Sequence, residues 1–264
     1  MTDLFVVIAA VFGLLAGSFV SAWSWRLNSD LSIARGRSIC PQCRHRLSAV
    51  DLIPVFSWLS ARGRCRYCEH SISGRYPIIE TVTASLFVAS FLSWNPAANM
   101  AIPGLITWLL IIVFMMVIAV YDYEHMLVPL LPVYIIGGLA LARLLLMAYT
   151  GVSLQVWLVS PLLAALFAGG FFYLLYRLSS ETWMGGGDVY LAIIMGLLLG
   201  LAKTALALFL AFNIAALISL SLIALKLKTR KDLVPFGPFM LGATVLAFLY
   251  GEQIIQWYQS LLLV

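Results

Sequence analysis

Apolar runs long enough to cross a lipid bilayer recur along most of this chain. A transmembrane helix needs about 20 largely apolar residues, because the hydrocarbon core of a bilayer is about 30 Å thick. The chain is 63% hydrophobic and only 10% charged, whereas soluble domains are far less apolar. A soluble fold of 264 residues could not bury that much apolar surface. The sequence therefore predicts an all-α polytopic membrane protein.

Eight runs are suitable for transmembrane helices. They lie near residues 4–25, 77–93, 104–121, 130–149, 155–176, 189–202, 204–225 and 236–258. The sixth run is short for a straight span, so it is either extended through the glycines before it or part of a broken helix. We expect about eight transmembrane helices, with an error of one. The chain is expected to have three parts: a first helix over 1–25, a cytoplasmic module over 26–76 and a membrane-embedded domain over 77–264.

The positive charges predict the orientation of these spans. Nine of the sixteen Lys and Arg residues lie in 26–76, four lie between the seventh and eighth runs, and Arg177 ends the fifth. Eight spans with both termini outside place these fourteen in the cytoplasm, where membrane proteins carry their excess of positive charge. The charges thus indicate topology rather than a nucleic-acid partner. Membrane lipids are the expected partner, with anionic headgroups bound by Arg35, Arg37, Arg44 and Arg46.

All four cysteines fall in the basic module, as two C-x-x-C pairs: Cys40 with Cys43, and Cys65 with Cys68. Each pair offers two thiolates on a tight turn, and two pairs complete the tetrahedral set of a structural zinc. Disulfides are the alternative, which a reducing cytoplasm disfavours. Four thiolates leave no open position on the metal. We therefore predict a zinc that stabilises a module with few aliphatic residues for a core.

Two acidic residues stand out at the ends of predicted spans. Asp122 lies at the cytoplasmic end of the third span, and Asp188 follows Gly185, Gly186 and Gly187 at the start of the sixth. The predicted topology places both carboxyls at one membrane face, where a charge next to lipid is costly enough to suggest function. Two carboxyls that share a site hold one proton between them, as peptide hydrolysis requires. The glycines would let an extended substrate backbone approach Asp188 closely.

Other roles are open for both residues. Asp122 alone would suit a solvated helix end, and Asp188 would suit the N-cap of the following helix. Glu124 and His125 compete with Asp122 for a chemical role. An ion-coupled transporter with the two aspartates as proton sites is the main alternative function, because transporters also use broken helices and membrane carboxylates. A zinc-bearing membrane scaffold without chemistry is a third interpretation.

Several segments together resemble the bacterial type IV prepilin peptidases, a family of GxGD aspartyl proteases. Gly185-Gly186-Gly187-Asp188 is similar to the GxGD motif, and Val234-Pro235-Phe236-Gly237-Pro238-Phe239 resembles the late PFGP motif. The segments that resemble the family's cytoplasmic module are Gly17-Ser18-Phe19-Val20, both cysteine pairs, Asp51-Leu52-Ile53-Pro54 and Gly74-Arg75-Tyr76-Pro77-Ile78-Ile79-Glu80. The resemblance covers nearly the whole chain in the family's order.

The resemblance implies a membrane aspartyl endopeptidase of the bacterial inner membrane, with Asp122 and Asp188 as its catalytic pair. Such enzymes cut the short basic leader from prepilins and pseudopilins at the cytoplasmic face, after a glycine. Many then methylate the new amino terminus with S-adenosylmethionine, and Glu80 is a candidate to receive or orient that amine or only marks the membrane interface. Two positions depart from the family pattern: Leu130 follows Pro129 where the family often has Asp, and Tyr190 stands where it often has Lys.

Overall fold

The computed structural model describes residues 2–29, 32, 36–94, 101–180, 184–229 and 232–262. Within these ranges the chain forms helices, turns and loops with two isolated β-bridges and no strand, which confirms the all-α prediction. Arg35, one of the arginines expected to bind lipid headgroups, lies outside the described residues.

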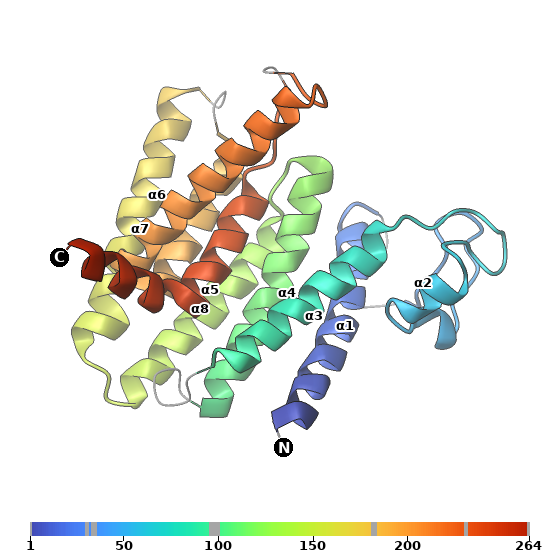
Figure 1. Ribbon diagram of the computed structural model, residues 1–264, viewed down its shortest axis with the longest axis horizontal. Helices are drawn as coiled ribbons and strands as arrows, with labels where there is room; N and C mark the ends of the chain where they lie inside the picture. Colours follow the sequence, from blue (N-terminus) through green and yellow to red (C-terminus); the bar gives the residue numbers. More distant parts are fainter. Residues whose placement is uncertain are drawn as a thin grey trace. The chain divides into compact units, whose positions relative to one another are not determined.

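Eight α-helices and two shorter helical turns make up the described chain (Figure 1). They are α1 (Thr2–Leu27), η1 (Val50–Leu52), α2 (Phe56–Ser60), α3 (Arg75–Leu92), α4 (Ala101–His125), α5 (Leu130–Tyr149), η2 (Gln155–Val159), α6 (Ser160–Leu178), α7 (Gly186–Ala224) and α8 (Gly237–Leu262). Six helices are long and apolar enough to cross a membrane: α1, α4, α5, α6 with η2, α7 and α8. The described residues thus contain six apolar spans where the sequence predicts about eight, because α3 is less apolar and α7 joins the sixth and seventh predicted runs.

Helix α7 is broken at Gly200, whose φ of 71° and ψ of 177° are not helical. A break in a helix frees backbone groups that then need other partners in the protein. The N–H of Leu201 donates to Ser160 Oγ over 3.0 Å, and Arg143 Nη1 donates to the carbonyl of Leu198 over 3.4 Å. The predicted sixth and seventh spans are therefore two halves of α7, and their boundary lies at Gly200 rather than at residue 203.

The described chain divides into two compact units, residues 1–94 with 108–120 and residues 95–107 with 121–264. In the first unit α1 and α3 lie side by side (Figure 1). A Cβ at Gly13 would lie 2.5 Å from the Cα of Ala84, and a Cβ at Gly17 would lie 2.5 Å from the Cα of Glu80. Small residues one turn apart let membrane helices touch through their backbones. This contact positions Glu80 beside α1. The predicted three-part division of the chain stays a prediction.

In the second unit α7 packs against α5, α6 and α8. Gly196 allows the first half of α7 to touch the backbone of α6 at Ala164 and Ala165. The second unit also contains an aromatic cluster: the ring of Phe236, in the loop before α8, is 5.0 Å from that of Phe212 and 6.2 Å from that of Phe172. Because Phe172 is fully buried, the cluster fixes the loop that leads into α8.

Candidate active site

The two cysteine pairs fold into equivalent turns. In the first turn the N–H of Cys40 donates to the carbonyl of His45 over 3.0 Å, and the N–H of Arg44 donates to the carbonyl of Cys40 over 2.9 Å. The second turn repeats both bonds 25 residues later at Cys65 and Glu69, each over 2.9 Å. Arg44 and Glu69 have nearly the same φ, 55° and 57°. Each turn therefore presents its two cysteines in the same way.

The four sulfur atoms converge on one point. The Sγ atoms of Cys40, Cys43, Cys65 and Cys68 all lie within 4.8 Å of one another, and those of Cys40 and Cys68 are 3.9 Å apart. Tetrahedral metal–sulfur bonds of about 2.3 Å require sulfur–sulfur distances of about 3.8 Å, so this cluster can hold a metal ion. All four cysteines are free thiols, against the disulfide alternative.

The Cys68 thiol keeps its proton at neutral pH unless a cation binds to the cluster. A backbone hydrogen bond with His70 lowers the pKa of Cys68, but desolvation and the neighbouring thiols of Cys65, Cys43 and Cys40 raise it to about 12. A metal ion binds thiolates and releases their protons, so it would reverse this shift. The predicted ligand set is thus present, whereas zinc as the metal stays a prediction.

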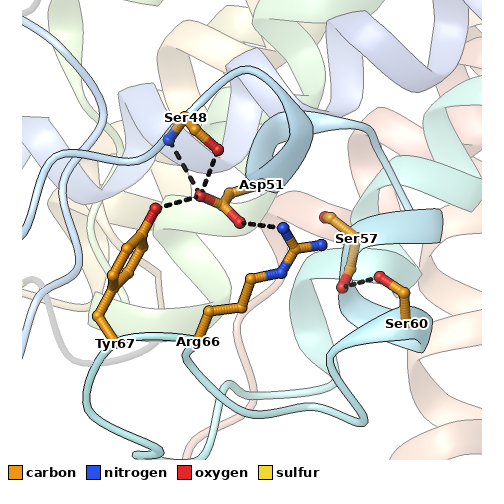
Figure 2. A network of polar contacts seen from close by, with 6 residues as sticks. All are labelled: Ser48, Asp51, Ser57, Ser60, Arg66 and Tyr67. Carbon is orange, nitrogen blue, oxygen red and sulfur yellow. Dashed lines mark hydrogen bonds and ion pairs between the residues drawn. The ribbon is translucent and has the colours of Figure 1, made fainter.

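Asp51 ties the second cysteine turn to the segment between the two turns (Figure 2). Its Oδ2 accepts hydrogen bonds from the hydroxyl of Ser48 at 2.7 Å, from the N–H of Ser48 at 3.0 Å and from Tyr67 Oη at 3.1 Å. Its Oδ1 lies 3.3 Å from Arg66 Nη1. These contacts, led by the Ser48 hydroxyl, hold the pKa of Asp51 below its usual range. Asp51 is therefore ionised at neutral pH and links both parts of the module.

Asp122 lies in the last turn of α4 and is buried, with 6% of its surface exposed. Its Oδ2 accepts a hydrogen bond of 3.1 Å from the N–H of Gly237, the first residue of α8. A Cβ at Gly237 would lie 2.5 Å from this oxygen, so any other residue would force the carboxyl or the helix start to move. The positive end of the α8 dipole therefore points at Asp122 and stabilises a negative charge there.

Asp188 lies in the first turn of α7 and is also buried, with 9% of its surface exposed. Its N–H donates to the carbonyl of Gly185 over 3.1 Å. The carboxyl of Asp122 is close enough to act electrostatically on that of Asp188. Leu191, one turn further along the same face of α7, would lie 3.3 Å from a Cβ at Gly237. The structure thus brings together the two aspartates that the sequence singles out.

The three glycines before Asp188 have different surroundings. A Cβ at Gly187 would lie 2.5 Å from Val128 Cγ2, so this glycine lets α7 pack against the loop after α4. A Cβ at Gly186 would lie 3.5 Å from an aromatic ring of α6, in ordinary contact. A Cβ at Gly185 would meet only atoms 4.0 Å away, including Asp188 Oδ2. Approach of a substrate along these glycines stays a prediction, and Gly185 has the most open surroundings.

Glu124 and His125, which compete with Asp122 for a chemical role, contact each other. Glu124 Oε2 lies 3.9 Å from His125 Nε2, and the His125 ring lies 4.5 Å from that of Tyr121. Both side chains are partly exposed, whereas Asp122 is buried. Asp122 is thus the acid of this turn that faces Asp188.

Glu80 lies on α3 and is buried, with 7% of its surface exposed. Its Oε2 accepts a hydrogen bond of 2.7 Å from the N–H of Val55, and its carboxylate also bonds the hydroxyl of Ser18. This environment differs from that of a solvated charge at a membrane interface. Sequence reasoning missed both the Val55 contact and the donation from Gly237 to Asp122. The available signal for the second was Gly237 itself, which precedes Pro238 at the expected start of the last span.

Two family models match the chain: the bacterial peptidase A24 N-terminal domain over residues 11–94 and the type IV leader peptidase family over residues 109–220. Several curated relatives carry the name prepilin leader peptidase/N-methyltransferase. The relative from Bacillus subtilis (strain 168) is 33% identical over 249 residues, which cover 94% of this chain and 95% of that protein. The relative from Aeromonas salmonicida (strain A449) is 33% identical over 230 residues, 86% of this chain and 76% of that protein.

A third relative, from Legionella pneumophila, is 31% identical over 229 residues, which cover 86% of this chain and 77% of that protein. No solved structure matches the chain. The alternative interpretation as an ion-coupled transporter gains no support from these similarities. With its multi-pass helical fold, its four-cysteine cluster and its paired aspartates, this chain belongs to the type IV leader peptidase family of membrane proteases.

Proposed function

We propose that this chain removes the leader peptide from type IV prepilins or pseudopilins, with Asp122 and Asp188 as its catalytic pair. The observation that carries the proposal is the meeting of two buried carboxyls, from α4 and α7, at the N terminus of α8. The substrate class follows the names of the relatives, which are prepilin leader peptidases.

The pair holds one proton between its two carboxyls, because two carboxyls that share a site do not both ionise. The N–H of Gly237 stabilises the charge on Asp122, so the shared proton resides on Asp188. Asp122 takes a proton from water as the water oxygen attacks the scissile carbonyl carbon, and Asp188 donates a hydrogen bond to the carbonyl oxygen. Protonation of the amide nitrogen then releases the new amino terminus, and the leader leaves with a terminal carboxylate.

The catalytic pair and the cysteine module are assigned to the cytoplasmic face of the bacterial inner membrane. The excess of positive charge in 26–76 and 226–231, which the predicted spans place on the same side of the membrane as both features, supports this orientation. The helices expose many large apolar side chains, such as Leu145, Phe167 and Leu217, which require lipid around them. Membrane lipids and prepilins are therefore the proposed partners, with no role for nucleic acid.

Two further assignments complete the proposed function. The four cysteines hold one structural zinc, because a closed set of thiolates suits zinc and leaves no site for a substrate. The chain also methylates the new amino terminus, as the names of the relatives indicate for those proteins. S-adenosylmethionine would supply the methyl group.

The test is leader cleavage by the full-length chain in lipid nanodiscs, followed by mass spectrometry of a prepilin-type substrate. Asp122→Asn and Asp188→Asn keep the side-chain volume but end the sharing of a proton, so each should lower the cleavage rate by about a thousandfold. Glu124→Gln is the matched control and should cleave at a rate near that of the wild type. Near-normal turnover by either Asn variant would show that the pair is wrongly assigned.

A further inference from the structure

An apolar stripe lies exposed on the cysteine module. It consists of four large side chains at every third position between the start of η1 and the end of α2: Val50, Ile53, Phe56 and Leu59. Hydrogen bonds of consecutive turns run through this segment, and side chains three positions apart lie on one side of such turns. Between 45% and 63% of each of the four residues is exposed. An exposed apolar patch next to charged residues marks a surface that contacts a membrane or another protein.

The other side of the same segment is held against the first unit by three polar contacts. Asp51 binds the second cysteine turn, as Figure 2 shows. The N–H of Val55 donates to the carboxylate of Glu80 on α3 over 2.7 Å. Trp58 Nε1 donates to the carbonyl of Ile72 over 3.0 Å. These contacts fix the segment, so the stripe faces away from the module rather than into it.

Helix α1 shows the level at which the stripe lies. The exposed large apolar residues of α1 run from Leu4 to Phe19, and the rest of the helix is buried or half-buried. The exposed part requires lipid around it. At its edge the hydroxyl of Ser18 bonds the carboxylate of Glu80, which also accepts from the N–H of Val55. The stripe therefore lies level with the edge of the lipid-exposed part of α1, where interfacial helices bury their apolar faces.

Exposed arginines accompany the stripe. Arg62 continues its spacing of three residues directly after Leu59 and is exposed. Arg44, Arg46 and Arg64 are exposed elsewhere on the same module. Anionic lipid headgroups attract such clusters of arginine beside a membrane. A purely apolar protein surface would leave these charges without a counterpart, whereas an anionic bilayer supplies acyl chains and negative charges at one boundary.

We propose that the apolar stripe inserts into the interface of an anionic bilayer, with its side chains among the first acyl carbons and the neighbouring arginines on the headgroups. The insertion anchors the cysteine module to the membrane at a point outside α1 and α3, and so fixes its orientation relative to the bilayer. The proposal does not depend on the peptidase activity proposed above.

The test replaces Phe56 with the photoreactive amino acid p-benzoylphenylalanine in the full-length chain. Nanodiscs hold equal amounts of neutral phosphatidylcholine and anionic phosphatidylglycerol, and mass spectrometry identifies the adducts after irradiation. Phe12 on α1 is the matched lipid-facing control, because it is 60% exposed where Phe56 is 63% exposed. Glu69 is the water-facing control, since an exposed charge of the same module contacts water. Leu59 is a second labelling position, and thermal unfolding shows that each labelled chain is folded.

The probe at position 56 should give lipid adducts in about the same yield as the probe at position 12, and about tenfold more than the probe at position 69. Phosphatidylglycerol should be enriched about twofold among the adducts at position 56 relative to those at position 12, because the arginines gather anionic headgroups. The probe at position 59 should behave as that at position 56.

Four results would overturn the proposal. Adducts between position 56 and residues 121–262 would show that the second unit covers the stripe, and a crosslinked dimer would show that a second copy does. Adducts that form only with an added prepilin-type substrate would make the stripe a substrate-binding surface. A lipid yield at positions 56 and 59 no higher than at position 69 would place the stripe in water. The same lipid composition at positions 56 and 12 would refute the part assigned to the arginines.

Discussion

Replacing Gly237 with Ala tests whether the proposed catalytic pair, Asp122 and Asp188, depends on a glycine that contacts it. The new Cβ would lie 2.5 Å from Asp122 Oδ2, whereas real Cβ atoms essentially never come closer than 3.0 Å. The carboxyl or the start of α8 must therefore move by at least 0.5 Å, which is the tolerance within which catalytic groups must be held. A misplacement of about 1 Å costs about a hundredfold in rate, so Gly237→Ala should cleave between about ten and a hundred times more slowly.

The assay is leader cleavage in nanodiscs over a range of substrate concentrations. The loss should appear in kcat with little change in KM, because the change moves a catalytic carboxyl and not a binding surface. Gly242→Ala is the matched control in the same helix, since no atom lies within 4 Å of its Cβ. That variant should cleave normally and gain up to about 1 kcal/mol of stability from its higher helix propensity.

Normal cleavage by Gly237→Ala would refute the reasoning, because it would mean that the approach of α8 to Asp122 does not set the geometry of the pair. A similar loss in both variants would also count against it, since the effect would then come from α8 as a whole. A thermal unfolding curve of each variant shows whether a loss of cleavage comes from a misfolded chain. Overpacking at Gly237 should cost about 1–3 kcal/mol, which leaves the chain folded at the assay temperature.

Metal analysis of the purified chain should give about one zinc per chain. Cys65→Ser should lose the metal while Asp122→Asn keeps it, and a metal-free wild type with four titratable thiols would contradict the assignment. Asp51→Asn should reduce amide-exchange protection across residues 48–72 at neutral pH, because the ionised carboxylate links the module. A lowered pKa stabilises the fold above the ordinary value of 3.8 and loses this effect as the pH falls below it. The difference between wild type and variant should therefore shrink as the pH falls below 3.8, and a constant difference would exclude the charge as its cause.

The parts of the fold and site that depend on short-range patterns could be predicted from the sequence. The spacing of Cys40, Cys43, Cys65 and Cys68 predicts a four-sulfur cluster because each pair forms a local turn, and the structure confirms it. The spans follow from hydropathy, which local composition determines. The break in α7 is harder to place, because a left-handed Gly200 looks in sequence like the helical Gly196 four residues earlier.

Contacts between distant segments could not be predicted in this way. The hydrogen bond from Gly237 to Asp122 joins residues 115 positions apart, and that from Val55 to Glu80 joins a loop to a helix. These contacts depend on how the helices pack against one another. The sequence pattern within a single segment carries no information about that packing. The two aspartates were found because a carboxyl is costly beside lipid, a property of each residue alone. Their catalytic role stays a proposal until the Asn variants are assayed.

Because α7 is broken at Gly200, its first half can tilt about that residue. Asp188 lies 12 residues from the break, a distance of about 18 Å along the helix. A tilt of only about 3° about Gly200 would move Asp188 by about 1 Å, enough to change the rate of hydrolysis by about a hundredfold. The geometry of the proposed catalytic pair is therefore set partly by the contacts at Gly200. At Gly200, Ser160 and Arg143 form hydrogen bonds with the freed backbone groups and so restrict this motion.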